Sequence, residues 1–403
     1  MRTSAQNIQF LNRGCEKIEN GTTGVSMHCH TKYSREWLDF IPYYAERIPI
    51  LASFWRREMR KRLDENGSLP DFKAGYWEPP LDGPDVFEAE TANLARRGLR
   101  GIVSITDHDS LSANLNLTRR LGTGSAPISM EWTVPYREAF FHFGIHNLPA
   151  GEAEEISQRL LDYTFAGGVP DNDRLTDILT LLGETPDTLV VLNHPIWDIE
   201  MIGQERHENA LRDLLKDHRD KIHAIEVNGF RPWKENEQAI ALAEAVGLPI
   251  VSGGDRHCCQ SNTMINVTNA TTFSEFVHEV RVDRRSQIAV MPEYNLPLPW
   301  RQLRSMKQIL ADYPHFPTER QRWTDRVFLD CHDGNGLRTM TEHWEGRQPS
   351  LATVGLIALS VLSHRASLPF IGLLVGDNDI GRNDSRSSAE IAAIGILPLA
   401  TER

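Results

Sequence analysis

Cysteine is scarce in this sequence, and its five cysteines do not form the pattern of a disulfide framework. Their number is odd, Cys258 and Cys259 are adjacent, and Cys29 stands between two histidines. Disulfide-stapled proteins usually carry an even number of cysteines, and their bonds persist mainly outside reducing compartments. The N-terminus also lacks the basic and then apolar segment that is typical of a signal peptide. We therefore expect a cytoplasmic protein.

An excess of positive charge is missing as well. Lysine and arginine total 43 against 55 aspartates and glutamates, so that the formal net charge is −12. Extended nucleic-acid-binding surfaces are normally basic, and this balance argues against one. A nucleotide or the end of a nucleic acid can still enter a cleft whose metal ions supply positive charge.

Long apolar runs are also absent. The most apolar stretch, Leu351 to Ser363, is separated from Leu368 to Val375 by His364 and Arg365. Neither half reaches the roughly 18 apolar residues of a spanning helix, so we expect no membrane-spanning segment. The content of 40% hydrophobic and 24% charged residues is ordinary for a globular protein.

The sequence does contain four short apolar runs that each lead into metal-binding types of side chain. Runs of this kind, bounded by turn signals, are typical of buried strands. In α/β barrels the reactive groups lie at the C-terminal ends of such strands, so the pattern predicts a polynuclear metal site. The four segments are Met27-His28-Cys29-His30-Thr31, Thr106-Asp107-His108-Asp109, Asn193-His194-Pro195 and Gly254-Asp255-Arg256-His257.

Spacing within these segments supports shared binding. His28 and His30 are two residues apart and therefore face the same side of a strand, where both can bind one ion; Asp255 and His257 have the same spacing. The alternative for the first pair is two half-buried histidines bonded to carbonyl groups. Cys29 points away from both histidines on an ideal strand, and we discount it as a ligand or nucleophile.

Four other residues are candidates on weaker grounds. Glu131 closes a predicted strand from Ala126 and is either a carboxylate that bridges two ions or a surface residue. His142 and His146 compete for one ligand position in an apolar run, where core histidines are common. Asp107 can bind metal, cap a helix or orient a ligating histidine, and we favour the last role.

Strand and helix signals alternate along the chain, which predicts parallel βαβ units and an α/β fold. Residues 35–90 interrupt this alternation. Their middle, Ala45 to Leu63, is helical in pattern and basic, and we interpret it as part of a helical lid that attracts an anionic substrate or as a solvated helix face. Leu303 to Ala311 and Thr318 to Phe328 are predicted helices, and Asp377 to Ser388 a polar loop.

The order of these motifs resembles that of the PHP (polymerase and histidinol phosphatase) superfamily over roughly residues 25–290. The resemblance implies a distorted seven-stranded (β/α) barrel over residues 1–290, with the helical insertion after its first strand, and a C-terminal extension over residues 291–403 of unassigned role. It also implies two or three divalent metal ions. The implied ligands are His28, His30, Glu131 and Asp255 for one ion, Glu131, His142 and His194 for a second, and His108 and His257 for a third.

One departure from the family pattern concerns the third ion. The family usually has an aspartate where this chain has Arg35. Either Glu36 or Asp39 replaces it, or Arg35 binds substrate phosphate through its two-pronged guanidinium. Arg256 occupies a position that is usually small in the family; it is a second candidate phosphate-binding residue or forms a salt bridge beside the site.

The ligand types define the chemistry that we expect. Histidine and carboxylate groups suit zinc, manganese or iron, and paired ions lower the pKa of a bridging water and neutralise phosphoryl oxygens. The resemblance implies hydrolysis of a phosphoester, with a small phosphorylated substrate or nucleotide as partner. The alternatives are amidohydrolase-type cleavage of a C–N bond at the same site, or a degenerate barrel kept as a metal-binding or regulatory module.

Overall fold

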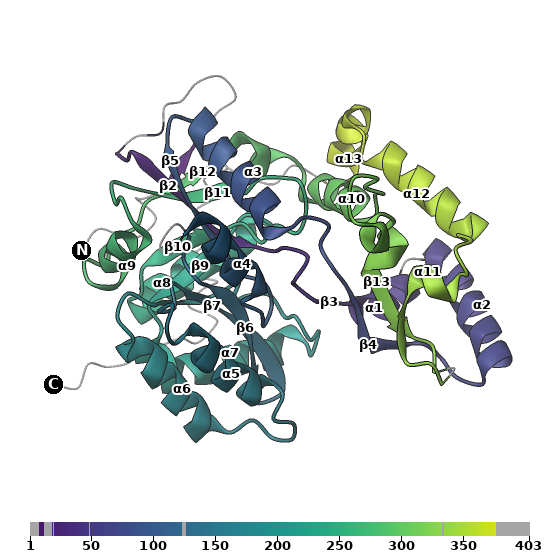
Figure 1. Ribbon diagram of the computed structural model, residues 1–403, viewed down its shortest axis with the longest axis horizontal. Coiled ribbons are helices and arrows are strands. Elements are labelled where there is room, and N and C mark those ends of the chain that lie inside the picture. The colour runs from purple at the N-terminus through teal and green to yellow at the C-terminus, as the bar shows by residue number, and fades with distance from the viewer. Residues whose placement is uncertain are drawn as a thin grey trace.

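The computed structural model describes residues 8–11, 18, 20–47, 49–122, 126–332 and 334–375. It has two lobes, which Figure 1 shows side by side. The large lobe holds two five-stranded sheets with flanking helices, and the small lobe holds one four-stranded sheet with its own helices. The polar loop predicted at Asp377 to Ser388 lies outside the described residues.

The first sheet of the large lobe has the strand order β1-β12-β11-β2-β5. β2 pairs in parallel with β5, and β1 with β12, whereas β11 is antiparallel to both β2 and β12. All seven residues of β2 are buried, as expected for a strand covered on both faces. The bounds are β1 Ile8–Phe10, β2 Thr23–Cys29, β5 Arg100–Ile105, β11 Met264–Thr268 and β12 Ile288–Val290.

The second sheet has the order β10-β9-β8-β7-β6. Here β8, β9 and β10 are parallel, while β7 is antiparallel to both of its neighbours. β6 and β7 are joined by a two-residue turn at Arg137 and Glu138, and so short a connection permits only antiparallel pairing. The bounds are β6 Met130–Tyr136, β7 Ala139–His146, β8 Leu189–Leu192, β9 Ala224–Asn228 and β10 Ile250–Gly253.

The prediction of uniformly parallel βαβ units is therefore wrong at β7 and β11. The predicted barrel is also not seen as a closed ladder among the described residues. The two sheets instead meet through single bridges at their ends, one between Cys29 and Arg256 and the other between His108 and Glu131. These two bridges bring the ends of β2, β5, β6 and β10 to the same region, and that region carries the predicted ligands.

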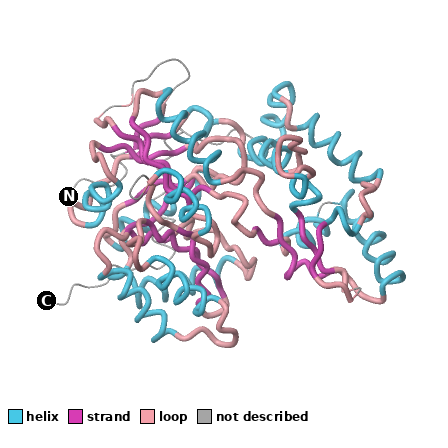
Figure 2. The backbone as a smooth tube through the Cα atoms, in the orientation of Figure 1, coloured by secondary structure: helices cyan, strands magenta, loops and turns pink. Residues whose placement is uncertain are grey.

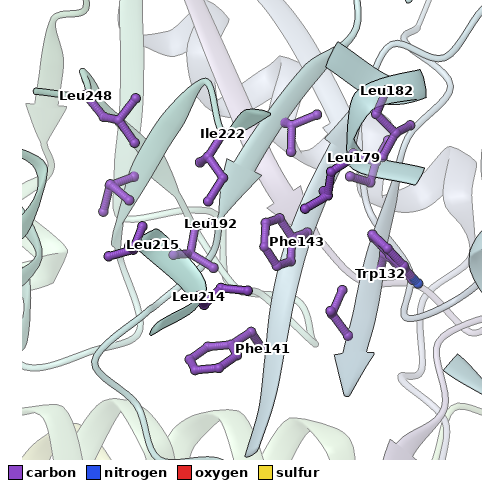
Figure 3. Close-up of a cluster of buried hydrophobic side chains, with 14 of the residues drawn as sticks. Trp132, Phe141, Phe143, Leu179, Leu182, Leu192, Leu214, Leu215, Ile222 and Leu248 are labelled. Atoms are coloured by element: carbon purple, nitrogen blue, oxygen red, sulfur yellow. The ribbon is translucent and has the colours of Figure 1, made fainter. Parts of the chain in front are cut away.

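Helices cover the sheets and bury one extended apolar core. Figure 3 shows Trp132, Phe141 and Phe143 of the β6–β7 hairpin packed with Leu179 and Leu182 of α6. The α3 helix begins after Asp82, whose side chain caps it, and α8 ends at Gly247 in the left-handed conformation, as its sequence predicts. The bounds are α3 Gly83–Arg96, α4 Ser112–Leu121, α5 Ala153–Thr164, α6 Asn172–Glu184, α7 Gln204–His218, α8 Trp233–Val246 and α9 Phe273–Arg281, with short 3₁₀ turns at Arg219–Lys221 and Pro292–Asn295.

The small lobe joins two distant parts of the chain. Its sheet has the order β14-β13-β4-β3, so that strands of the insertion pair with strands of the C-terminal extension; Figure 2 shows these strands apart from those of the large lobe. The lobes therefore do not follow a sequence division at residue 290, and the insertion is not wholly helical. The bounds are β3 Glu36–Trp37, β4 Asp71–Trp77, β13 Val327–Asp330, β14 Leu337–Thr339, α1 Phe40–Arg47, α2 Pro49–Asn66, α11 Met340–His343, α12 Ser350–Leu362 and α13 Leu368–Val375.

The helix predicted from Thr318 to Phe328 is wrong. This segment forms two short 3₁₀ turns, Thr318–Arg320 and Trp323–Arg326, and then enters β13. Val327 and Phe328 pair with Trp77 and Tyr76 of β4, and this tertiary pairing overrides the local helical pattern. The helix predicted from Leu303 is present but begins earlier, as α10 Leu298–Ile309.

The apolar segments near the end of the described chain were tested as membrane spans. No single helix among the described residues is long and apolar enough to cross a bilayer. Ala352–Leu362 and Arg365–Gly372 reach the length and apolar composition of a span only together, as a pair bent by 68° at the break between them.

Candidate metal centre

The end of β2 places His28 and His30 together. Both rings are buried, and their centroids lie 5.1 Å apart. The pairing of β2 with β5 shifts register between Met27 and Cys29, and His28 adopts a left-handed φ of 62°. Cys29 is directed away into a buried polar network, and burial raises the pKa of its thiol to about 12. This thiol is not a nucleophile at neutral pH.

Glu131 is the centre of the site. Its carboxylate is fully buried, and five histidine nitrogens lie within 3.4 Å of its oxygens. One oxygen faces His28, His30 and His108, and the other faces His142 and His194. Asn193 also donates to this carboxylate at 2.9 Å. Glu131 stands at the start of β6 rather than at the end of a strand from Ala126, because residues 130–136 pair with β7.

A second group of ligands forms around Glu36 of β3. One Glu36 oxygen lies 3.2 Å from Nε2 of His257 and 3.5 Å from Nε2 of His108. The ring of His30 stacks on that of His257, with centroids 4.2 Å apart. Of the two carboxylates proposed to replace the family's aspartate, Glu36 thus joins the site, and Asp39 joins none of the clusters found among the described residues.

Glu226 is a residue of the site that was not predicted from the sequence. Its carboxylate accepts from Nδ1 of His28 at 2.6 Å and from the backbone N–H of His194 at 2.8 Å. A signal existed, because Glu226 stands between the buried Ile225 and Val227 on a strand and so faces the opposite, inner side. Gly253 has no room for a side chain because the Glu226 carboxylate lies against it: a Cβ there would lie 1.7 Å from Glu226 Oε1.

Several site residues have strained backbones. Besides His28, the φ angles of Asp109, His194 and Asp255 are 51°, 24° and 51°, in the left-handed region. Such conformations cost roughly 1–3 kcal/mol each for residues with a side chain and persist where the surroundings impose them. These left-handed residues gather at the strand ends that form the site. The surrounding structure therefore holds the backbone there in conformations that the residues alone would not prefer.

Asp107 was predicted to orient a ligating histidine, but it contacts Thr31 instead. Its carboxylate accepts from the backbone N–H of Thr31 at 2.5 Å and from the Thr31 hydroxyl at 2.8 Å, and so it anchors the loop after His30 rather than a histidine ring. Asp255, by contrast, lies beside the predicted partners, 3.7 Å from His28 and 3.6 Å from His30.

The two predicted phosphate-binding arginines differ in position. Arg35 is exposed, and its guanidinium lies over the ring of Tyr76, 4.9 Å from the centroid. Arg256 is only 4% exposed; it pairs with Glu90 at 2.5 Å and donates twice to the carbonyl of Cys258. The structure therefore favours the salt-bridge interpretation of Arg256, because its donors are engaged with protein groups.

Of the two histidines that competed for one ligand position, His142 lies at the centre and His146 does not. Nδ1 of His142 lies 3.3 Å from Glu131. His146 is buried elsewhere, with Nδ1 2.8 Å from the hydroxyl of Ser104. His146 is therefore a core histidine, the alternative that its apolar run suggested.

The carboxylates of the site attract positive charge strongly. Burial alone lowers the pKa of His28, but Glu131, Glu226 and Asp255 outweigh it and hold that pKa well above its usual value. Burial likewise opposes protonation of His108, yet Glu36 and Glu131 raise its pKa to about 10. The site is thus built to hold cations, whether protons or metal ions.

Other histidines of the site are kept neutral. Burial, and then the neighbouring His257, lower the pKa of His30 to about 3. Burial also lowers the pKa of His142 to about 4, although Glu131 opposes it. Burial raises the pKa of Glu131, but His28 and the other histidines hold it well below its usual value. Neutral imidazole and ionised carboxylate are the forms that bind metals.

The hydrogen-bond network fixes which nitrogen of His30 carries the proton. The Ser34 hydroxyl donates to Glu36 at 2.7 Å and can therefore only accept from Nδ1 of His30 at 3.1 Å. The lone pair of His30 Nε2 is then directed at Glu131 and Asp255, which are also acceptors, and this nitrogen has no hydrogen-bond partner. Acceptors that converge in a buried site need a cation between them.

The donor set fits divalent metals. Four groups of ligand atoms each lie within 4.8 Å of one another, and His142 Nδ1 and His194 Nδ1 are further buried nitrogens without a hydrogen-bond partner. Histidine and carboxylate ligands suit zinc, manganese and iron. The groups are His30, Glu36, His108 and His257; His28, His30 and Glu131; His28, His194 and Glu226; and His108, Glu131 and His142.

No family model and no curated protein matches this chain. Solved structures that are similar to it at a low level include the following three. They are PsfC from Pseudomonas syringae PB-5123 (14% identity, TM-score 0.39, 68% of this chain and 94% of that chain covered), an amidohydrolase from Chromobacterium violaceum with bound SO4 and no metal (13%, 0.33, 58% and 87%), and a "putative metal-dependent phosphoesterase" from Bifidobacterium adolescentis ATCC 15703 (14%, 0.32, 65% and 96%). TM-scores below 0.5 establish neither a shared fold nor a shared activity.

The fold and the site together define a mixed α/β protein with a buried histidine–carboxylate centre that can hold metal ions. All eight of the predicted metal ligands meet at this centre, joined by Glu36 and Glu226.

Proposed function

We propose that this chain is a metal-dependent phosphoesterase of the PHP type, which hydrolyses a small phosphorylated substrate or a nucleotide. The observation that carries the proposal is the buried carboxylate of Glu131 with five histidines around it. The predicted ligands are separated by up to 229 positions between His28 and His257, and their convergence on one point supports the resemblance that their order suggested.

The chain's own residues would hold two or three ions of zinc, manganese or iron. Glu131 offers one oxygen to each of two ligand groups and can bridge them, while Glu36, His108 and His257 complete a third. Bound metals of this kind supply an activated water and neutralise phosphoryl oxygens.

Several residues orient the ligands. Glu226 accepts the Nδ1 proton of His28 and so turns Nε2 toward Glu131. Ser34 performs the same task for His30, and Asn193 fixes the Glu131 carboxylate. Such outer partners typically affect metal affinity by 10- to 100-fold.

The small lobe contributes to the same centre through β3. Glu36 of β3 faces His257, and the ring of Trp77, which pairs with Glu36 across the sheet, lies 5.7 Å from the ring of His257. We therefore assign the insertion the role of a lid whose closed position completes one ligand group. We also propose that the seven strands β2 and β5 to β10 correspond to a distorted barrel, joined at its two seams by the single bridges described above.

The test is metal content and hydrolysis measured together. Protein purified without chelator is expected to carry two or three zinc, manganese or iron ions per chain by elemental analysis, and to release phosphate from a panel of phosphomonoesters and nucleotides. Glu131→Gln should lose most of the metal and the activity, since it removes the charge shared by five histidines.

His146→Gln is the matched control. It removes another buried histidine, from the neighbouring strand β7, that contacts Ser104 rather than the centre. Metal content and turnover should stay near wild type. Metal-free protein that cannot be reloaded would contradict the proposal, and turnover of amides without turnover of phosphoesters would replace it with C–N hydrolysis.

A further inference from the structure

Arg301, in the C-terminal extension, is buried without enough hydrogen-bond partners. The residue lies on α10 and is 3% exposed. One of its nitrogens, Nη1, donates to the carbonyl of Gly229 at 2.6 Å, and its guanidinium lies over the ring of Tyr294. The other two nitrogens, Nε and Nη2, are buried and have no hydrogen-bond partner. Two strong donors are therefore left open.

Two other buried arginines of the described chain have more partners than Arg301, although Nε of Arg326 also lacks one. Arg256 pairs with Glu90, and Arg326 donates to four backbone carbonyls, those of Ile309, Ala311, Arg320 and Arg322. Among the described residues, no carboxylate forms an ion pair with Arg301. Burial lowers the pKa of Arg301 to about 10, so that its guanidinium remains charged at neutral pH. An unpaired buried charge is costly, which indicates a site for an anion.

Arg301 lines a small cavity whose lining also includes His257 of the candidate centre. The cavity has a volume of about 30 Å³ and separates α10 from the loop that carries Asp255 and His257. His257 lines its other side, together with Gln260, whose side-chain nitrogen is also buried without a partner. One buried water needs roughly 10–15 Å³, so the cavity has room for about two oxygen atoms.

We propose that Arg301 and Gln260 form an oxyanion-binding site beside His257 that takes two oxygens of a phosphate group. The guanidinium fork matches two oxygens of one oxyanion, and the three buried nitrogens without a partner belong to two residues that line a space of that size. The choice of phosphate over carboxylate rests on the proposed function. The C-terminal extension then supplies a residue that recognises the substrate.

Water alone is the competing occupant of the cavity. Two waters would satisfy the open donors but would not neutralise Arg301. The two occupants predict different behaviour with inorganic phosphate, because only an anion site is stabilised by it.

The experiment measures phosphate binding without relying on turnover. Full-length protein as purified is titrated with inorganic phosphate, and both the unfolding temperature and the apparent Kd are recorded for wild type, Arg301→Met and Lys307→Met. Lys307 is an exposed cation on the same helix and serves as the control. We expect phosphate to raise the unfolding temperature of wild type and Lys307→Met, and Arg301→Met to bind phosphate about tenfold or more weakly.

The same variants separate recognition from a structural role. Without phosphate, Arg301→Met should unfold at the wild-type temperature or higher, because removing an unpaired buried charge is often neutral or stabilising. An equal response to phosphate in wild type and Arg301→Met, or no response in wild type, would overturn the proposal. If Arg301→Met does not fold, Gln260→Leu must weaken phosphate binding for the proposal to stand.

Two further outcomes have separate meanings. Acetate is the second probe, and a response equal to that with phosphate would overturn the assignment to phosphate. Phosphate binding that depends on Arg301 in a protein without phosphoesterase activity would contradict the proposed function and leave the oxyanion site in place.

Discussion

At the residue scale, Glu36 shows how one side chain from a separate lobe completes a metal-binding group. It is buried, and His108 and His257 hold its pKa well below the usual value although burial opposes them. His30 and His108 also belong to other ligand groups, whereas Glu36 and His257 belong only to this one among the clusters of the described residues. Removing the Glu36 carboxylate should therefore affect this group of ligands and leave the groups around Glu131 in place.

Glu36→Gln is expected to lose one metal ion per chain and to retain the ions bound around Glu131. The lost negative charge leaves His108 and His257 without their shared carboxylate. Elemental analysis against a calibrated protein concentration measures the stoichiometry, with Asp39→Asn as the control on the same segment. Unchanged stoichiometry in Glu36→Gln would show that Glu36 is not a ligand.

His223 provides a pH-dependent prediction outside the metal centre. Its Nδ1 accepts from the backbone N–H of Val190 at 2.9 Å, and burial, followed by the nearby Arg281 and Arg284, lowers its pKa to about 3 from the ordinary 6.5. In the unfolded chain the ring takes up a proton below about pH 6.5. The stability that depends on the neutral ring is therefore present above pH 6.5 and is lost as the pH falls toward 3.

His223→Gln should remove this part of the acid sensitivity. Between pH 6.5 and 4, the free energy of unfolding of wild type should fall more steeply than that of the variant, by up to about 1.4 kcal/mol per pH unit. Urea unfolding at a series of pH values measures the difference. Parallel curves would mean that His223 has the same pKa in the folded and unfolded chains.

Residue chemistry and strand position were enough to predict eight of the side chains that lie together at the candidate centre. His28, His194 and Asp255 were recognisable because each follows an apolar run. Glu36 remained one of two options, since its place depends on how β3 pairs with β4 in another lobe. Arg301 could not be predicted at all, because nothing local to its helix indicates that it faces the loop of His257.

At the scale of elements, the sheet of the small lobe depends on pairing between β4 and β13. Leu329 of β13 is 6% exposed and packs with Leu38 and Cys331. An ion pair between Arg320 and Glu78 also connects the two segments. This packing holds β4, and through it β3 with Glu36.

Leu329→Ala should loosen the small lobe without unfolding the large one. Removing a buried leucine side chain typically costs about 2–5 kcal/mol. Hydrogen exchange measured by mass spectrometry should become faster in β3 and β4 and stay unchanged in β8. Phe370→Ala, at a position that is 59% exposed, is the control. Faster exchange in β8 as well would show that the lobes unfold together.

Some helices and strands were predicted correctly and others were not, and the difference has a physical reason. The α10 helix was recognisable because helical periodicity acts locally. The strand β13 was mistaken for part of a helix, and the antiparallel β7 for part of a parallel unit, because pairing partners lie elsewhere in the sequence. The predicted distorted barrel likewise depends on contacts between sheets, which appear here as single bridges.

At the scale of the whole molecule, the large lobe gathers buried carboxylates and neutral histidines in a chain with a formal net charge of −12. Cations that bind the folded state and not the unfolded one stabilise it. Metal ions bound at the candidate centre are therefore expected to contribute to the stability of the entire protein.

Chelation should lower the unfolding temperature of the wild-type protein, and added zinc or manganese should restore it. A metal present at 100 times its Kd stabilises the folded state by about 2.7 kcal/mol. Differential scanning calorimetry with and without chelator measures the change, and Glu131→Gln should show a smaller one. An unchanged unfolding temperature in wild type would indicate that the centre binds no metal with useful affinity.

The two paired strands of the small lobe are synthesised at different times. β4 ends at Trp77, and its partner β13 begins at Val327, so that synthesis of the partner comes roughly 250 residues later. At a synthesis rate of about 5–20 residues per second, the edge of β4 stays unpaired for on the order of ten to fifty seconds while the ribosome makes the rest of the chain. An unpaired strand edge is prone to associate with other chains. The nascent protein therefore passes through an interval in which His28, His30 and Glu131 have already been made while β4, the strand that pairs with Glu36, still lacks its own partner β13.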